Sequence, residues 1–340
     1  MKVLVYFQPS PKHDNFEGAR MRKTIKGALE VIGAAYTSNI LDDYDVAHFM
    51  SPEDENKLNI VLERKIPVVV SALFGEADPS TRFLNYKSTD GKRITTIKPK
   101  ALRMLNKADL ILVPCKTGKD FLIANGVNRP IEICVPGVNL SRFNFSREDE
   151  KELFYRYFRE DKDKKLVVAL GEYAYNLEGI HAVINAAVKR PDVTFYYVGD
   201  ESFALTNRRS KKIIKSSPKN MHFIGIPTDD IYRSMLLNAD VFMLPGYNYS
   251  GFISIEEAMA SNCQLIVRKT AVCPEMFKNE KNAYIAEFSE TLTSLCLDYL
   301  DGKIKPTTEE AYRKISLYSL ENFGNELLNT YKTLVAKKNR

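Results

Sequence analysis

The part of this sequence with the clearest chemistry is a basic stretch over residues 82–129. It carries eleven Lys and Arg residues against three Asp residues, a net charge of +8, whereas the whole 340-residue chain carries +6. A positive surface of this kind attracts the phosphates of anionic lipid or of nucleic acid. Apolar side chains alternate with the cations, as on surfaces that meet lipid, and no nucleic-acid recognition motif accompanies them.

We therefore expect the basic stretch to meet an anionic membrane surface and no nucleic acid. The alternative is a solvated helix face whose charge does nothing specific. The cations expected to face the membrane are Arg82, Lys92, Arg93, Lys98, Lys100, Arg103 and Lys107.

Neither the cysteines nor the histidines form a metal-binding or nucleophilic pattern. The five cysteines are widely spaced within apolar runs, so we expect small buried residues rather than a disulfide or zinc framework. His48, His181 and His222 each lie in or beside an apolar run, and we expect structural roles for them. No metal site is expected.

Length and composition favour two globular domains. The chain is 44% hydrophobic and 27% charged, and 340 residues suffice for two cores. No apolar run reaches the roughly 18 to 20 residues that span a bilayer, and residues 1–7 are too short for a signal-peptide core. We expect a cytoplasmic protein, peripheral at the inner face of the cell membrane.

The elements that must position these residues alternate between strand and helix, which predicts an open doubly wound sheet. In the first half, apolar runs predict strands at 2–7, 44–49, 67–73, 108–114 and 131–135. Helical spacing predicts helices at 18–32, 53–64 and 117–124. The first domain then ends near residue 145, and the charged residues 144–165, with a short amphipathic helix between two charged runs, are expected to connect the domains.

The same rhythm begins again in the second half. Strands are predicted at 166–171, 193–199, 221–224, 241–244 and 264–267, and helices at 179–189, 231–239 and 253–260. The predicted fold class is α/β, with two Rossmann-like domains, 1–145 and 146–340, facing a cleft. The last helix is expected to pack back on the first domain.

Four blocks of residues stand in order along both halves. They are 1–6 with 43–48, 108–114 with 136–143, 190–199, and Ala239-Asp240-Val241-Phe242-Met243-Leu244-Pro245 followed by 257–261. In order and spacing they resemble family 4 glycosyltransferases of the GT-B fold. The closest resemblance is to bacterial enzymes that add a second hexose to monoglucosyl-diacylglycerol.

The resemblance implies a donor site in the second domain. In the family, the second Glu of a Glu-x7-Glu motif binds the ribose hydroxyls of a sugar nucleotide, and Glu257 takes that position. The residues that open its helix would offer backbone N–H groups and a positive helix end to the diphosphate. They are Gly251, Phe252, Ile253 and Ser254. The alternative is that Glu256 and Glu257 are only helix-surface or capping acids.

Several positions depart from the family pattern. Tyr249 stands where the first Glu of the motif belongs, and Glu172 and Glu178 stand where the family has an Arg or Lys pair. A carboxylate there repels a diphosphate unless a cation intervenes. The cations available from elsewhere are Arg208, Arg209, Lys211, Lys212 and Arg268.

Two departures fall in the first domain. Residues 70–74 lack the family's active-site histidine, and Phe16 and Glu17 occupy its glycine-rich loop. The sequence therefore names no catalytic residue.

The resemblance implies a retaining transfer of a hexose from a nucleotide sugar, a uridine diphosphate hexose, to a membrane glycolipid or similar acceptor. No cofactor and no metal are expected. The departures leave a second hypothesis open, in which the chain is a catalytically silent glycosyltransferase-like subunit. Such a subunit would partner an active glycosyltransferase or bind nucleotide sugar.

Overall fold

The computed structural model describes residues 1–7, 16–78, 82–89, 92–143, 148–171, 177–199, 208–246, 253–269 and 276–338. For residues 16–19, 89, 92, 93, 209 and 210 it describes the backbone alone. By their contacts, these residues divide into two compact units. Unit 1 contains Met1–Gly137, Ile253 and Tyr318–Arg340, and unit 2 contains Val138–Asn248 and Ser254–Leu317.

Unit 1 is built on a parallel sheet, which has six strands within the described residues, in the order β2-β1-β3-β4-β7-β8. The strands are β1 (Lys2–Tyr6), β2 (Ala35–Thr37), β3 (Val46–Phe49), β4 (Val68–Ser71), β7 (Leu110–Val113) and β8 (Ile131–Ile133). The helices are α1 (Phe16–Val31), α2 (Glu55–Glu63), α3 (Pro99–Lys107), α4 (Lys116–Ala124) and α13 (Leu320–Lys338).

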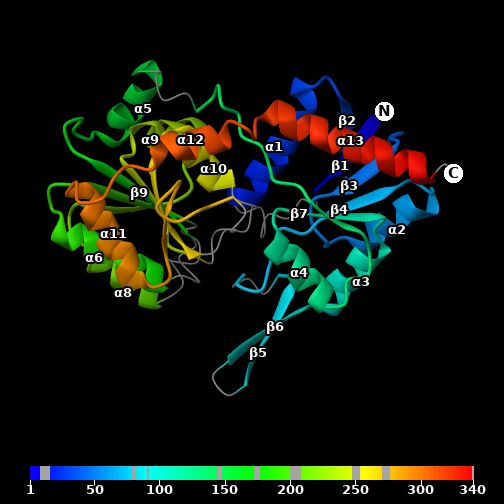
Figure 1. Cartoon of the computed structure of the whole chain (residues 1–340), viewed down its shortest axis with the longest axis horizontal. Coiled ribbons are helices and arrows are strands. Elements are labelled where there is room, and N and C mark those ends of the chain that lie inside the picture. The colour runs from blue at the N-terminus through cyan, green and yellow to red at the C-terminus, as the bar shows by residue number, and fades with distance from the viewer. Residues whose placement is uncertain are drawn as a thin grey trace. The chain divides into compact units, whose positions relative to one another are not determined.

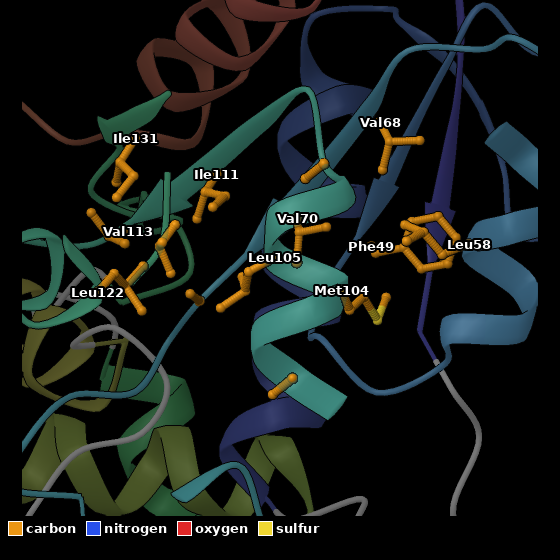
Figure 2. Packing of buried hydrophobic residues seen from close by; sticks show 14 of the residues in the cluster. Phe49, Leu58, Val68, Val70, Met104, Leu105, Ile111, Val113, Leu122 and Ile131 are labelled. Carbon is orange, nitrogen blue, oxygen red and sulfur yellow. The ribbon is translucent and has the colours of Figure 1, made fainter. Parts of the chain in front are cut away.

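Alternate residues of these strands feed two separate cores, because successive side chains of a strand point to opposite faces. Val68 and Val70 belong to one core, whereas Val69 between them belongs to the other. The first core lies under α2, α3 and α4, and Figure 2 shows Leu58, Met104 and Leu122 of these helices around the strands. The apolar runs of the sequence are therefore strands buried on both faces.

The second face of the sheet is covered by α1 together with the last helix of the chain, α13. Phe323, Leu327 and Tyr331 of α13 are at most 4% exposed and share a core with α1 and the strands. Figure 1 shows α13, in red, running along unit 1 beside α1. The final helix thus belongs to unit 1, although unit 2 precedes it in the chain.

A two-stranded antiparallel hairpin interrupts this pattern between β4 and α3. Its strands β5 (Leu84–Thr89) and β6 (Lys92–Ile97) pair from Leu84↔Ile97 to Thr89↔Lys92. The hairpin extends away from the sheet of unit 1 (Figure 1). This hairpin is not among the elements predicted from the sequence, and part of the basic stretch lies on it.

Unit 2 repeats the architecture, with six parallel strands within the described residues in the order β11-β10-β9-β12-β13-β14. The strands are β9 (Leu166–Leu170), β10 (Thr194–Val198), β11 (Met221–Ile224), β12 (Val241–Leu244), β13 (Gln264–Arg268) and β14 (Tyr284–Ala286). The helices are α5 (Glu148–Phe158), α6 (Leu177–Lys189), α8 (Arg208–Lys215), α9 (Asp229–Asn238), α10 (Ile253–Ala260), α11 (Ser289–Leu300) and α12 (Thr308–Ile315).

Helices α6, α8 and α11 cover one face of this sheet. Ile180 of α6 and Leu292 of α11 lie in the core beneath that face, and Ile213 and Ile214 of α8 pack against it. The predicted α/β class with two Rossmann-like halves is therefore confirmed.

The division of the chain differs from the predicted boundary at residue 145. The structure divides the chain after Gly137, because Arg142 forms ion pairs with Asp229 and Asp230 of α9 in unit 2, at 3.7 and 3.8 Å. Val138 and Phe143 are also buried, each 3% exposed.

The prediction that residues 144–165 form a connection between domains is wrong for α5, which belongs to unit 2. Phe154 is 1% exposed, and its ring centroid lies 5.5 Å from that of Tyr196. Its backbone N–H donates to Ser234 Oγ of α9 at 2.8 Å. The first charged run lies on this packed helix, with Glu148 and Asp149 exposed, and the second, residues 161–165, is exposed after the helix ends. Composition alone does not distinguish such a helix from a linker.

Among the described residues, none of the helices combines the length and the apolar character needed to span a membrane.

Candidate functional site

The sheet of unit 2 has a switch point between β9 and β12. From β9 the chain moves outward to β10 and β11, then returns to place β12 on the other side of β9. Ligands of open α/β sheets bind beyond the carboxyl ends of the strands at such a point. Helix α6 follows β9 and α10 follows β12, so both helices begin at this edge with their positive ends toward it.

Helix α10 is almost entirely buried. Seven of its eight residues are buried, including Ile253 at 2% and Ser254 at 0% exposure, and Glu257 alone is partly accessible. A helix buried all round is held by packing, so its N-terminus and the Glu257 carboxylate are fixed in position. The sequence-predicted residue is thus the one residue of α10 that is partly exposed, although Oε2 of its carboxylate is itself buried.

The neighbouring Glu256 is 0% exposed. The alternative interpretation made both glutamates helix-surface or capping acids. Its helix-surface form is therefore wrong for Glu256, and its capping form stays a prediction. Burying a carboxylate is costly without partners, so this helix carries acidic residues for a reason other than solubility.

A cavity of about 390 Å³ lies in unit 2 where β13 ends and α6 and α11 begin. Arg268, the last residue of β13, donates from Nη1 to Ser289 Oγ at 2.8 Å. Its Nη2 lies 3.6 Å from Oε2 of Glu178, whose side chain is 83% exposed. The residues that line the cavity are Glu178, His181, Ala182, Asn185, Arg268, Phe288, Ser289 and Glu290.

This geometry answers one question raised by the sequence. Glu178 stands where the resemblance implies a base, and the structure brings the guanidinium of Arg268 beside it. Because Glu178 is exposed, their attraction contributes little to stability. The fold places the guanidinium of Arg268 near the start of α6. Arg268 is one of the five cations that the sequence makes available to offset the carboxylates there.

Four of the predicted site residues cannot be located. Tyr249, Gly251, Phe252 and Glu172 lie outside the described residues. Of the residues predicted at or near the donor site, the structure therefore describes Ile253, Ser254, Glu257 and Glu178.

Some cations of the predicted membrane surface form ion pairs with carboxylates of unit 1. Arg82 forms an ion pair and hydrogen bonds with Glu53. Arg103 and Lys107 both pair with Glu55 of α2, at 3.1 and 2.9 Å. Hydrogen bonds from these two cations lower the pKa of Glu55 to about 2.

Of the remaining predicted membrane cations, Lys100 is exposed and Lys98 is half-buried. The side chains of Lys92 and Arg93 lie outside the described residues. Three of the seven cations thus bind carboxylates of their own unit. The sequence did not indicate these pairs, because Glu53 and Glu55 lie outside the basic stretch.

The histidines differ in their surroundings. His48 is fully buried, and His222 Nε2 lies 3.6 Å from Glu160 Oε1. His181 is exposed and lines the cavity beside Glu178, so the expected structural role does not describe its position. The sequence missed Asn185, Phe288 and Ser289 as neighbours of Arg268, because only the folded chain brings them together.

Cys115, Cys134, Cys263 and Cys296 are buried, as expected, and burial raises the pKa of the Cys296 thiol to about 12. Cys273 lies outside the described residues. Within the part of the chain that the structure describes, no three His, Cys, Asp or Glu side chains cluster as metal ligands would.

Two doubly wound parallel units in one chain are the architecture of GT-B proteins, and solved structures match it over nearly the whole chain. Anabaena HepE, solved in complex with UDP and glucose, gives a TM-score of 0.74 at 14% identity, covering 98% of this chain and 99% of that one. The sucrose-phosphate synthase of Thermosynechococcus elongatus gives 0.76 at 12% identity, covering 99% and 100%. These similarities establish the GT-B fold.

Sequence comparison adds similarity to known glycosyltransferases. Residues 150–312 match the family described as glycosyl transferases group 1. The processive diacylglycerol alpha-glucosyltransferase of Acholeplasma laidlawii is 26% identical over 99% of this chain and 100% of its own length. The alpha-galactosylglucosyldiacylglycerol synthase of Streptococcus pneumoniae is 28% identical over 43% of this chain and 40% of its own. The chain is a glycosyltransferase of the GT-B type, similar to glycolipid synthases.

Proposed function

We propose that this glycosyltransferase moves a hexose from a uridine diphosphate hexose to a membrane glycolipid or similar diacylglycerol-based acceptor, with retention of the anomeric configuration. The observation that carries the donor half is Glu257, the one partly exposed residue of a buried helix at the switch point of unit 2. The relatives named as diacylglycerol and glycosyl-diacylglycerol enzymes support the acceptor class. Their alpha linkages match the alpha linkage of common UDP-hexose donors, which supports retention.

In this proposal unit 2 binds the donor. The Glu257 carboxylate accepts hydrogen bonds from the ribose hydroxyls, and the N-terminus of α10, with Ile253 and Ser254, faces the diphosphate. Residues Gly251 and Phe252 complete that N-terminal segment in the sequence. Arg268 counters the charge of Glu178, so that the leaving diphosphate meets a balanced pair rather than a lone carboxylate.

The proposal assigns the stabilisation of the leaving group to these side chains and helix N-termini, without a metal ion or other cofactor. Electrostatic groups fixed in place before reaction are the usual source of such stabilisation. Unit 1 would receive the acceptor at the inner face of the membrane. The hypothesis of a silent partner subunit gains no support, since the matched relatives are named as enzymes.

Turnover tests this proposal directly. The purified chain is mixed with UDP-glucose or UDP-galactose and glucosyl-diacylglycerol in detergent micelles, and both released UDP and the lengthened glycolipid are measured. We expect both products in equal amounts. Absence of UDP release, with enzyme near the substrate concentration, would refute the transfer.

A variant of Glu257 tests the donor site. Glu257→Ala removes a charge-assisted hydrogen bond to the ribose, worth about 1.5 to 3 kcal/mol, so we expect UDP binding to weaken roughly 10- to 100-fold. Calorimetric titration with UDP measures it. Glu309→Ala removes an exposed carboxylate from α12 of the same unit and serves as the matched control. Equal UDP affinity in wild type and Glu257→Ala would reject the ribose assignment.

A further inference from the structure

Helix α8 presents a row of four cations on one side. Arg208, Lys211, Lys212 and Lys215 follow the spacing i, i+3, i+4, i+7, which places them on one face of the helix. All four side chains are exposed. We call them the cationic stripe, and exposed Lys219 follows just beyond the helix.

The opposite face of α8 fixes the direction of the stripe. Ile213 and Ile214 are half-buried and pack against the core of unit 2. In helical projection these two residues lie opposite the stripe. The stripe therefore points away from the core, on the face of unit 2 that α6 and α11 also cover (Figure 1).

The stripe differs from the cations of the basic stretch in unit 1. Arg103 and Lys107 are held by Glu55, whereas within the described residues no ion pair involves any member of the stripe. Like charges at i, i+3 and i, i+4 oppose helix formation. The stripe therefore does not stabilise its own fold, and an anionic partner outside the unit would relieve its repulsion.

We propose that the cationic stripe of α8 docks on the anionic phospholipid headgroups of a bilayer. The inference rests on the proposed function, because a diacylglycerol-based acceptor resides in a bilayer. The contact is electrostatic, since the isoleucines of α8 face the protein and leave no apolar side to insert. Residues 208–219 contain no aromatic side chain on which nucleic-acid bases could stack.

Vesicle co-sedimentation of the full chain tests the stripe. The variant Lys211→Gln/Lys212→Gln/Lys215→Gln removes three charges while keeping good helix formers. Each Lys near an anionic surface strengthens binding about fivefold, so we expect roughly 100-fold weaker partitioning onto vesicles of phosphatidylglycerol and phosphatidylcholine. Binding of the wild type should also fade at about 1 M salt, where the Debye length is about 3 Å.

The matched control removes the same charge from other sites of unit 2. Lys278, Lys281 and Lys305 are exposed and lie on none of the helices α6, α8 and α11, and their triple Gln variant should partition within about fivefold of the wild type. Equal melting temperatures would confirm that both variants are folded. An equal loss in the control, wild-type binding by the stripe variant, or equal binding to pure phosphatidylcholine would each overturn the proposal. A stripe variant that loses single-stranded RNA binding but keeps vesicle binding would do so too.

The binding assay contains neither donor nor acceptor, so its outcome is independent of turnover. Stripe-dependent vesicle binding without glycosyl transfer would refute the proposed function and leave the docking surface standing. Glycosyl transfer by a protein whose vesicle binding ignores the stripe would refute the docking surface alone.

Discussion

His48 is a histidine held uncharged inside unit 1. Its Nδ1 lies 2.7 Å from the hydroxyl of Tyr331 on α13, and its Nε2 lies 2.7 Å from Ser71 Oγ on β4. Burial lowers the pKa of His48 to about 3, from an ordinary value of 6.5. The neutral imidazole of His48 therefore links its own strand, β3, to β4 and to α13 through hydrogen bonds.

This burial predicts a pH dependence of stability. Between pH 6.5 and about 3 the unfolded chain protonates His48 and the folded chain does not, so the free energy of unfolding falls as pH falls, by up to about 1.4 kcal/mol per pH unit. In His48→Gln this slope should be absent between pH 6.5 and 5, above the range where most carboxylates titrate. Urea unfolding at a series of pH values measures it.

The control for the pH experiment is His181→Gln, which removes an exposed histidine. Its stability should follow the wild-type pH curve. Parallel curves for His48→Gln and the wild type would show that His48 is not the buried titrating group.

The donor-site residues show what a sequence reveals at this scale. Glu257 was predicted because its position in a motif is local information. The link from Arg268 to Ser289 was not, because it joins the end of β13 to the start of α11 across an intervening segment. Likewise, no local pattern indicates that Arg103 and Lys107 are paired with Glu55 of another helix.

At the scale of elements, α13 and α1 approach closely at a glycine. A Cβ on Gly324 would overlap the carbonyl oxygen of Ala28 and lie 3.0 Å from its carbonyl carbon. Backbone atoms of a packed helix cannot move aside cheaply. Glycine at this position thus sets the distance between the two helices that cover one face of the sheet.

Gly324→Ala should therefore destabilise unit 1 by about 1 to 3 kcal/mol, the usual cost of overpacking. Thermal unfolding followed by circular dichroism measures it. Gly27→Ala is the matched control, because a Cβ there would meet only Leu320 Cδ1 at 3.5 Å. Alanine favours a helix over glycine, so this control should be neutral or stabilising. Equal loss in both variants would contradict the close-approach argument.

Elements were predicted well where apolar runs were long and less well where charge dominated. Ten of the twelve strands that the structure describes in the two sheets follow predicted apolar runs, and α10 lies at 253–260 as predicted. The short strands β2 and β14 were missed, and β2 contains no buried residue. The β5–β6 hairpin was missed, although Asp90-Gly91 between its paired ends is a strong hairpin signal. Residues 92–97 are charged at the start and do not alternate strictly between apolar and polar side chains, so their periodicity is a weak strand signal.

At the scale of the whole molecule, the chain leaves unit 1 after Gly137 and, apart from Ile253, returns to it at Tyr318. Gly137 lies against Ser319, since a Cβ on the glycine would be 2.7 Å from the Ser319 carbonyl oxygen. The outgoing and returning segments are therefore in contact at the edge of unit 1. In topological terms unit 2 is an insertion into unit 1.

Removal of residues 318–340 should consequently destabilise unit 1, to which these residues belong, and spare unit 2, which directly precedes them in the sequence. Unit 1 would lose the burial of Phe323, Leu327 and Tyr331, each worth about 1.5 to 3 kcal/mol, a sum comparable to the stability of a whole domain. Hydrogen exchange should show lost protection in β1 and β3 but retained protection in β9 and β12. Equal loss of protection in both units would contradict this division.

The insertion also sets the order in which the protein can fold during synthesis. The face of the unit 1 sheet that α13 covers stays open while the ribosome makes about 180 residues of unit 2. At about 5 to 20 residues per second this takes on the order of ten to forty seconds. Unit 2 can finish folding first, and the first-made half of the chain must wait, with apolar surface exposed to chaperones, for the last helix to arrive.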